Sequence, residues 1–579
     1  MIHSPFRHHL PSEDLWPTII RDRPELEYPA TLNLATVLLD DHVEHGNADR
    51  TAILAGDGRT TYGELQRLTN RIGHALRGLG VRPRDRVAMR FLNGVPFAAT
   101  WLAVQKIGAI GVSTMPMLRA RELAYIVNDS EAAVFVCQHD LMERLRLERG
   151  AGVPNAAPAL GWPTGGKPGE AGPPSESERG WGPASRDDEV SRARASFDHP
   201  VTIVTAEDLI AGGSDRLDAE PVSRSDVALI AYTSGSTGVP KGATHTPADM
   251  LASADCYSRH VLEMKPDDVC GGHPTLAFTF GLGGLLVFPF RVGACTSLID
   301  RFSPETLLAR IAADRITVLF CAATTYRLLL QDPNLERAHD LSSLRLCVSA
   351  GEPLPAAAYE EWHRRIGVEI LDGIGSTEMF HIFVSARRGR VRAGSTGTAV
   401  PGYEARVVDD HLDEVARGTP GLLAVRGPTG CRYWRKPERQ REYVRGGWNV
   451  TGDVYRQDAD GYFWHLCRND DLIICGGYNI AGPEVENVLL EHDAVLEAAV
   501  VASPDALRQA VPKAFVVLKN GVASSAALAT ALQEHVKREL APYKYPREIE
   551  FVDALPRTET GKIRRVELRE REIQRKAAR

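Results

Sequence analysis

The chain has 579 residues, enough for two to four globular domains, and its 43% hydrophobic and 25% charged residues are ordinary for a globular protein. A formal net charge of -7 disfavours a nucleic-acid-binding protein, which usually carries a basic face. The nine cysteines occur singly and form no CxxC pair, so the sequence favours neither a zinc site nor a disulfide framework.

Targeting and membrane signals are weak. The N-terminal stretch MIHSPFRHHLPSEDLWP lacks the apolar core of a signal peptide. The most apolar long stretch, residues 276–290, contains three glycines. It is also shorter than the ~18 residues that a membrane-spanning helix needs. Because free thiols fit a reducing compartment, we expect a cytoplasmic protein without a membrane or nucleic-acid partner. The sequence leaves open whether it is a monomer or a homodimer.

The first clear element is an amphipathic helix over TTYGELQRLTNRIGHALRGLG, residues 60–80. Its apolar residues recur at spacings of three and four, namely Leu65, Leu68, Ile72, Leu76 and Leu79. Thr61 and Glu64 have the spacing of a capping box, and Gly80 provides a stop. Helical segments then alternate with short apolar runs, which are DRVAM, AAVFV, VALIAY, ITVLF and LRLCVSA. This alternation predicts an α/β fold with mostly parallel sheets.

Two later regions differ in composition. Residues 150–196 are rich in Gly, Pro and Ser and have no period, which favours a flexible surface insertion over a functional lid. From about Gly418 the chain reads as turn-rich strands, including GLLAVRG and GYFWHLC, and an apolar stripe near the end marks another helix. We predict an N-terminal domain over residues 1–469, with a β-rich part, and a small mobile α+β domain over 470–579.

The stretch DVALIAYTSGSTGVPKGATHT, residues 226–246, combines a buried strand with a loop of Gly, Ser and Thr. Successive small residues can turn their N–H groups inward to hold an anion, and Lys241 adds a positive charge. A plain surface turn is the alternative. The loop does not match the Walker pattern G-x-x-x-x-G-K-[ST], which disfavours a kinase or Walker ATPase. Pro240 opposes a helix starting directly after Gly238, so we do not expect phosphate to sit on a helix N-terminus here.

The segment TSGSTGVPKG resembles [ST]-S-G-[ST]-T-G-x-P-K-G, the phosphate-binding motif of the AMP-forming adenylating enzymes. This family includes acyl- and aryl-CoA synthetases, luciferases and peptide-synthetase adenylation domains. The resemblance continues in order with DGIGSTEMF, in which Asp372 is placed where an aromatic residue is commonest. It continues further with VTGD, with CRNDDLIICGGYNIAGPEVE and with LPRTETGKIRR. A T-G-D turn alone is common, but the ordered set is specific and covers nearly the whole chain.

The resemblance implies the roles of individual residues. Lys562, Glu378 and Thr233 would be catalytic, and Glu378 and Thr233 would hold Mg²⁺, which agrees with the preference of this cation for oxygen ligands. The implied ATP-binding set is Thr233, Ser234, Gly235, Ser236, Thr237, Gly238, Lys241, Gly351, Glu352, Pro353, Asp372, Gly373, Gly375, Ser376, Thr377, Asp453 and Arg468.

The same resemblance implies ATP, Mg²⁺ and coenzyme A as the reactants and cofactors. The carboxylate of an acid would attack the α-phosphorus of ATP, and pyrophosphate would leave. The C-terminal domain would then turn about Asp470, removing Lys562 and bringing Gly476 and Gly477 to the tunnel for coenzyme A. Without side chains, these glycines let the pantetheine arm pass close to the backbone.

The acid is suggested by a narrower resemblance. LAFTFGLG and STEMFHIF are similar to segments of benzoate- and 2-aminobenzoate-CoA ligases, as are parts of the N-terminus. This implies an aromatic-acid pocket lined by Thr279, Phe280, Gly351 and His381, with Phe280 stacking on the ring. His381 would bond the carboxylate or an ortho substituent. Phe280 and His381 as plain core residues are the alternative, and the ring substituent stays open.

Other functions share the ATP motifs. A carrier-protein adenylation domain and a luciferase-like oxygenase would carry the same residues, although no carrier module follows Lys562 within this chain. A catalytically inactive nucleotide-binding protein is the alternative from another class. Thr233, Glu378, Asp453 and Lys562 are all present, which argues against that alternative.

Overall fold

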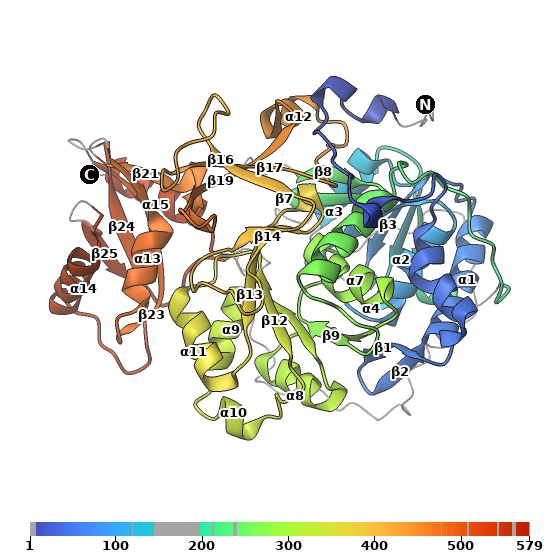
Figure 1. The fold of residues 1–579 in the computed structure, drawn as a ribbon, viewed down its shortest axis with the longest axis horizontal. Coiled ribbons are helices and arrows are strands. Elements are labelled where there is room, and N and C mark those ends of the chain that lie inside the picture. The colour runs from blue at the N-terminus through green and yellow to red at the C-terminus, as the bar shows by residue number, and fades with distance from the viewer. Residues whose placement is uncertain are drawn as a thin grey trace.

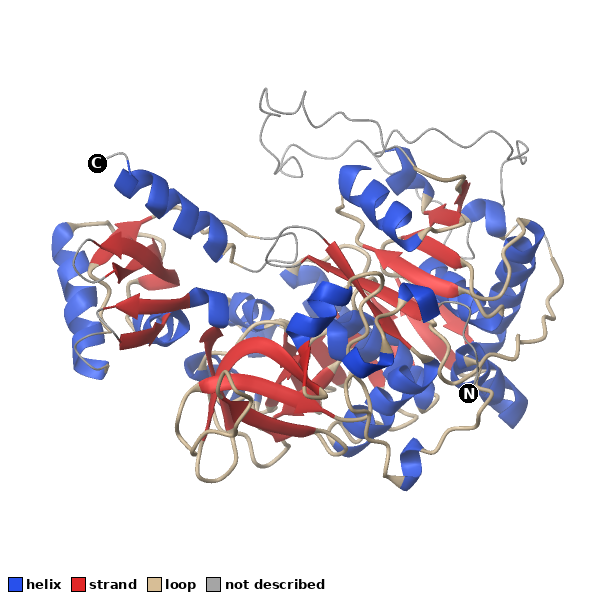
Figure 2. Ribbon diagram, turned by 90° about the horizontal axis from the view of Figure 1, so that it is seen from above, coloured by secondary structure: helices blue, strands red, loops and turns tan. Residues whose placement is uncertain are grey.

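The computed structural model describes residues 7–118, 120–143, 197–210, 213–234, 240–475, 478–505, 509–540, 544–557 and 563–577. The predicted insertion at 150–196 lies outside the described residues. The described residues form four β-sheets with helices around them, and Figures 1 and 2 show the arrangement from two directions.

The largest sheet has nine strands, and its central strands run parallel. Its order is β15 (Thr398–Ala399), β14 (Ile382–Ser385), β13 (Ile370–Gly375), β12 (Leu346–Ala350), β11 (Val318–Cys321), β9 (Val269–Gly272), β10 (Cys295–Leu298), β1 (Thr51–Ala55) and β2 (Gly58–Thr61). The strands at its two ends, β2 at one and β14 and β15 at the other, pair antiparallel.

The second sheet has six strands and is parallel except for its last strand. Its order is β6 (Thr202–Thr205), β5 (Val134–Cys137), β3 (Arg86–Arg90), β4 (Ile110–Thr114), β7 (Leu229–Ser234) and β8 (Pro240–His245). One hydrophobic core contains Ile53 and Val348 of the first sheet together with Val87 and Leu229 of the second. The two parallel sheets therefore belong to one packed body.

The third sheet is antiparallel and β-rich, as expected for the region after Gly418. It contains β16 (Glu404–Val408), β17 (Gly421–Arg426), β18 (Val444–Arg445), β19 (Trp448–Gln457) and β20 (Phe463–Arg468). The fourth sheet contains β21 (Leu472–Cys475), β22 (Tyr478–Ala481), β23 (Val495–Asp505), β24 (Gln509–Leu518) and β25 (Glu548–Phe551).

Sheet membership changes between Arg468, which ends β20, and Leu472, which begins β21. Figure 1 shows the fourth sheet and its helices at one end of the molecule, in orange and red, with the blue N-terminal part at the other. The predicted class is confirmed: α/β with mostly parallel sheets, a β-rich part and a small C-terminal α+β unit. The boundary at 469/470 and the mobility of the small unit stay predictions.

The α-helices cover the sheets and connect their strands. They are α1 (Tyr62–Gly78), α2 (Val95–Lys106), α3 (Ala120–Ser130), α4 (His139–Glu143), α5 (Pro247–Ser253), α6 (Thr279–Leu282), α7 (Phe288–Arg291), α8 (Pro304–Asp314), α9 (Ala323–Leu330), α10 (Leu335–Ala338), α11 (Ala356–Ile366), α12 (Pro437–Tyr443), α13 (Gly482–Leu490), α14 (Ala526–Glu539) and α15 (Arg565–Ala577).

The capping box predicted for the first long helix is present. Thr61 accepts from the Glu64 N–H at 3.2 Å, and the Glu64 carboxylate accepts from the Thr61 N–H at 2.8 Å. The nine cysteines are all buried free thiols. Within the described ranges, no helix has both the length and the apolar character needed to cross a membrane.

Candidate active site

The candidate phosphate loop connects two strands of the second sheet. Thr233 on β7 lies opposite Lys241 on β8, and Ser234 lies opposite Pro240. Gly235, Ser236, Thr237 and Gly238 fall outside the described residues. A strand, not a helix, begins at Pro240, as this proline led us to expect. Lys241 therefore lies on the strand that follows the candidate loop, opposite Thr233, and its contact with an anion stays a prediction.

Glu378 lies beside this hairpin, in the single turn η11 (Thr377–Met379) that follows β13. Ser376 caps that turn by accepting from the Met379 N–H at 3.2 Å. The Glu378 side chain takes no part in the cap, and the residue is only 8% exposed. Its Oε1 lies 3.9 Å from Lys241 Nζ. The fold thus brings together a carboxylate and an ammonium that are far apart in the sequence.

His245, on β8, fixes the position of that turn. Its Nε2 donates to the Thr377 carbonyl at 2.7 Å, which joins the end of the hairpin directly to η11. Ser376 adds a contact from its other side, since its Oγ lies 3.3 Å from the hydroxyl of Tyr443. The predicted residues Ser376, Thr377 and Glu378 are therefore held together around the same turn.

Tyr433 is the residue that sequence reasoning missed at this site. Its hydroxyl donates to Glu378 Oε1 at 2.6 Å and accepts from Lys241 Nζ at 3.2 Å. These contacts join residues separated by 55 and 192 positions, so no local pattern points to them. Burial and the Glu378 carboxylate raise the pKa of Tyr433 well above its ordinary value, which keeps the phenol protonated as a donor.

The glycines of the candidate motif serve close packing. At Gly375, a Cβ atom would lie 2.6 Å from the carbonyl oxygen of His381, and at Gly373 one would lie 2.9 Å from Ile382. Both glycines therefore let β13 approach β14. Counted back from Glu378, the aromatic position of Y-G-x-T-E falls on Ile374, so the placement of Asp372 at that position was wrong.

Asp372 is a buried carboxyl on β13, opposite Ser349 on β12. Burial raises the pKa of Asp372 to about 8. Its Oδ1 has no hydrogen-bond partner among the described residues. The side chain is therefore mostly neutral at pH 7. Its assignment to the ATP site stays a prediction.

Asp372 makes stability depend on pH. The folded protein keeps this proton up to pH about 8, whereas an unperturbed aspartate releases it near 3.8. Between these pH values the folded state binds more protons than the unfolded state. The free energy of unfolding therefore falls as pH rises, by up to about 1.4 kcal/mol per pH unit. Asp372→Asn cannot titrate and is expected to gain melting temperature over the wild type as pH increases from 5 to 8. Thermal melts at both pH values test this, and an equal difference at both would contradict it.

The candidate ribose residues form a pair. Asp453 on β19 lies opposite Arg468 on β20, and Arg468 Nη1 donates to Asp453 Oδ1 at 3.2 Å and to the Thr451 carbonyl at 3.3 Å. Gly452, between Thr451 and Asp453, has φ 78°, a left-handed conformation that favours glycine. The T-G-D turn therefore presents a carboxylate with a guanidinium beside it, a combination that can accept from and donate to ribose hydroxyls.

The segment after β12 contains three more predicted residues. Gly351 has φ 91° and is exposed, as is Pro353. The Glu352 carboxylate accepts from the Thr324 N–H at 2.5 Å, at the beginning of α9. Glu352 therefore caps a neighbouring helix in this structure, while the turn at Gly351 remains open to solvent.

His381 and Phe280 are brought together with other aromatic rings. The His381 ring centroid lies 5.4 Å from that of Phe280, 4.5 Å from Phe288 and 5.6 Å from Tyr257. Thr279 is adjacent to Phe280 on α6 and is buried. The imidazole also packs against the backbone of Gly283, where a side chain would not fit, since a Cβ there would lie 2.4 Å from the His381 Cδ2 atom.

The protonation state of His381 follows from its contacts. Its Nε2 lies 3.2 Å from the Phe280 carbonyl, and because a carbonyl only accepts, Nε2 carries the proton. Burial lowers the pKa of His381 to about 3, so the ring stays neutral near pH 7. His381 thus fixes the backbone at Phe280, which agrees with the structural alternative, and its contact with an acid stays a prediction.

The remaining predicted residues lie in the C-terminal part. Asp470 lies in the turn η12 (Asn469–Asp471), between the third and fourth sheets. Gly476, Gly477 and Lys562 fall outside the described residues. The next described residue after Lys562, Ile563, forms a bridge with Arg557.

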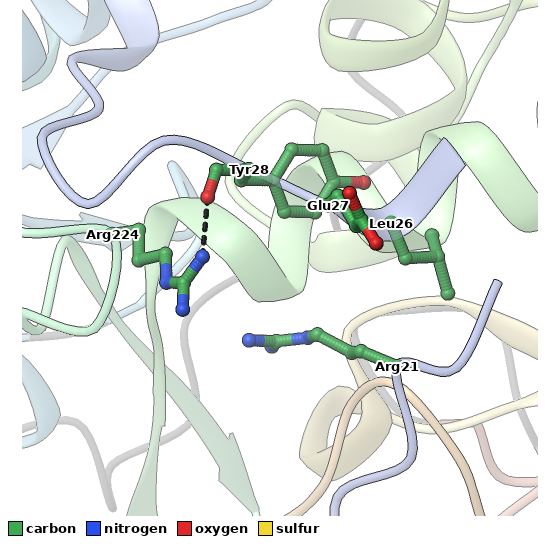
Figure 3. A pocket seen from close by; sticks show the side chains of 5 residues that line it. All are labelled: Arg21, Leu26, Glu27, Tyr28 and Arg224. Carbon is green, nitrogen blue, oxygen red and sulfur yellow. Dashed lines mark hydrogen bonds between the residues drawn. The ribbon is translucent and has the colours of Figure 1, made fainter. Parts of the chain in front are cut away.

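A pocket of about 330 Å³ is lined by Arg21, Leu26, Glu27, Tyr28 and Arg224, and Figure 3 shows these side chains. None of these residues belongs to the predicted site. Arg224 donates to the Tyr28 carbonyl, and Arg21 donates to Asp249 Oδ1 at 2.6 Å. Both guanidinium groups already bond within the protein and connect the N-terminal segment to the rest of it, so we assign no ligand to this pocket.

Comparisons with known proteins agree with this arrangement. A family model described as AMP-binding enzyme matches residues 39–434, and a model of the AMP-binding enzyme C-terminal domain matches residues 484–562. The chain is 37% identical to a benzoate–CoA ligase of Thauera aromatica, over 94% of this chain and 97% of that protein.

Solved structures give the same picture. The crystal structure of the anthranilate CoA ligase AuaEII in complex with anthranoyl-AMP has a TM-score of 0.82 and 34% identity, over 95% of this chain and 99% of that one. A benzoate CoA ligase from Burkholderia xenovorans LB400 has a TM-score of 0.78 and 33% identity, over 93% and 100%. The chain therefore belongs to the AMP-binding enzyme family, the AMP-forming adenylating enzymes.

Proposed function

We propose that the protein is an ATP-dependent aryl-CoA ligase. It activates an aromatic carboxylic acid as an acyl-AMP and transfers the acyl group to coenzyme A, releasing AMP and pyrophosphate. The observation that carries the proposal is the buried Glu378 carboxylate 3.9 Å from Lys241, beside the hairpin of the candidate phosphate loop. The similarity to benzoate and anthranilate CoA ligases over nearly the whole chain supports the aromatic class.

The donor atoms at this site fit Mg²⁺. Within the described ranges, no cluster of three or more His, Cys, Asp or Glu side chains forms a protein cage for a metal. Mg²⁺ does not need such a cage, because it usually keeps several waters and binds one or two carboxylates plus substrate phosphates. Glu378 would hold it, with the Thr233 hydroxyl nearby. The ion would neutralise charge on the leaving pyrophosphate.

The remaining residues position the reactants. Lys241 would bind phosphate as a mobile cation, and Asp453 with Arg468 would bind the ribose hydroxyls. Lys562 would bridge the acid carboxylate and the α-phosphate, where negative charge develops during attack. Rotation about Asp470 would then replace Lys562 with the segment of Gly476 and Gly477, next to which the thiol attacks the acyl-AMP.

The acid would lie near Thr279, Phe280 and Gly351. A flat ring suits this environment, because offset and edge-to-face contacts between aromatic rings are favourable. The neutral His381 would shape the pocket by holding the Phe280 backbone. The buried free thiols agree with the proposed cytoplasmic location.

A screen of acids tests the proposed function. The protein is incubated with ATP, Mg²⁺ and coenzyme A, and AMP is measured with benzoate, 2-aminobenzoate, hydroxybenzoates and fatty acids. We expect AMP formation to be fastest with a benzoate-type acid and to match coenzyme A consumption. A preference for a long-chain acid would contradict the aromatic class. AMP formation without thioester would indicate another acceptor, and no AMP with any acid would favour an inactive nucleotide-binding protein.

A further inference from the structure

We propose that the Tyr433 hydroxyl positions the Glu378 carboxylate for Mg²⁺ and couples it to Lys241. This inference rests on the proposed function, because it assigns Glu378 to the metal that accompanies ATP. Tyr433 is a positioning residue in this proposal, since it acts through Glu378 and does not touch the metal itself.

Three distances define the arrangement. Tyr433 Oη donates to Glu378 Oε1 at 2.6 Å, Lys241 Nζ donates to Tyr433 Oη at 3.2 Å, and Lys241 Nζ lies 3.9 Å from the same Oε1. Both contacts of the Glu378 carboxylate, with Tyr433 and with Lys241, fall on Oε1. Within the described parts of the chain, Oε2 accepts no hydrogen bond and is therefore the oxygen available to a cation.

The backbone fixes Tyr433 beside Lys241. Tyr433 forms a bridge with Ala243 on β8, and the next residue, Trp434, donates its N–H to the Gly242 carbonyl at 2.8 Å. The Tyr433 N–H donates to Gln440 Oε1 at 2.9 Å. The tyrosine ring is fully buried. The Tyr433 hydroxyl is buried, and both the backbone pairing and Lys241 restrict its orientation. Its hydrogen bond therefore holds the Glu378 carboxylate in a fixed position before the nucleotide binds.

The contacts also link the metal and phosphate residues. Lys241 balances the charge of Glu378 across 3.9 Å and donates to the hydroxyl that also donates to this carboxylate. With phosphate on Lys241, the Tyr433 hydrogen bond to Oε1 would keep the Glu378 carboxylate from turning away, so that its other oxygen could hold Mg²⁺. Groups that orient a metal ligand commonly contribute roughly 10- to 100-fold to metal affinity.

Equilibrium binding of ATP without acid tests the proposal, because no turnover occurs. Binding is measured calorimetrically over a range of Mg²⁺ concentrations and in EDTA for wild type, Tyr433→Phe and Tyr403→Phe. We expect Tyr433→Phe to raise the Mg²⁺ concentration required for half-maximal enhancement by roughly 10-fold or more and to leave binding in EDTA nearly unchanged. Tyr403→Phe is the matched control, since its buried hydroxyl contacts the neutral Thr429 Oγ1 at 3.0 Å.

A double-mutant cycle distinguishes positioning from a general structural role. In a Glu378→Gln background, Tyr433→Phe is expected to have no further effect on the Mg²⁺ dependence. An additive effect, an unchanged Mg²⁺ requirement or an equal loss in EDTA would overturn the proposal, and thermal melts confirm that each variant is folded. If wild type itself binds no ATP with Mg²⁺, the proposed function fails; if it binds and Tyr433→Phe is identical, only this inference fails.

Discussion

Replacing Lys562 with alanine is expected to lower acid-dependent pyrophosphate release by roughly 100- to 1,000-fold, the effect of removing one donor that stabilises developing charge in a transition state. The segment LPRTETGKIRR assigns this lysine by resemblance, and the negative charge that grows on the α-phosphoryl group is the physical reason for a cation there. ATP binding is expected to persist, because Lys241, Asp453 and Arg468 would hold the phosphates and ribose without it.

The two half-reactions separate this role from a general defect. Lys562→Ala is expected to convert supplied aryl-AMP and coenzyme A to thioester near the wild-type rate, because that step transfers no phosphoryl group. Lys576→Ala on α15 is the control, since Lys576 pairs with Glu548 at 2.6 Å and lies outside the motif. Adenylation by Lys562→Ala at the wild-type rate would show that the assigned role is wrong.

Local patterns predicted the elements that their own residues determine. The helix after Thr61 was predicted because its capping box and apolar spacing lie within a few turns of one another. The buried runs at β3, β5, β7, β11 and β12 were predicted for the same reason, and their alternation with helices predicted parallel sheets. Pro240 disfavoured a helix directly after the phosphate loop because its ring restricts the backbone and its nitrogen has no N–H to donate, and a strand begins there.

Contacts between distant segments could not be predicted in this way. Tyr433 reaches Glu378 because residues 432–434 pair with β8, and no sequence pattern in either segment predicts this pairing. The burial that raises the pKa of Asp372 likewise depends on its place in a central strand. The same holds for His381, whose ring was assigned to the acid pocket by resemblance and whose observed bond is to the Phe280 carbonyl.

Glu378→Gln is expected to lower the rate of Mg²⁺-dependent adenylation roughly 100-fold, because the metal site would lose its charged ligand. Glutamine keeps the shape of the side chain and an oxygen that can accept from Tyr433, but it carries no charge to hold the cation. Binding of ATP in EDTA is expected to remain close to wild type, since Lys241 would then be free of its carboxylate partner. Pyrophosphate release over a Mg²⁺ titration measures the first effect, and calorimetry the second.

Glu369→Gln provides the control for this substitution. Glu369 immediately precedes β13, whereas Glu378 follows that strand. The Glu369 carboxylate accepts from the Gly389 N–H at 2.9 Å. Glu369→Gln therefore removes the same charge at the other end of β13, and this variant is expected to keep the wild-type Mg²⁺ requirement. A Glu378→Gln protein with normal Mg²⁺ dependence would mean that the metal is held by phosphates and water alone, and the contact with Tyr433 would then serve only to keep a buried carboxylate paired beside Lys241.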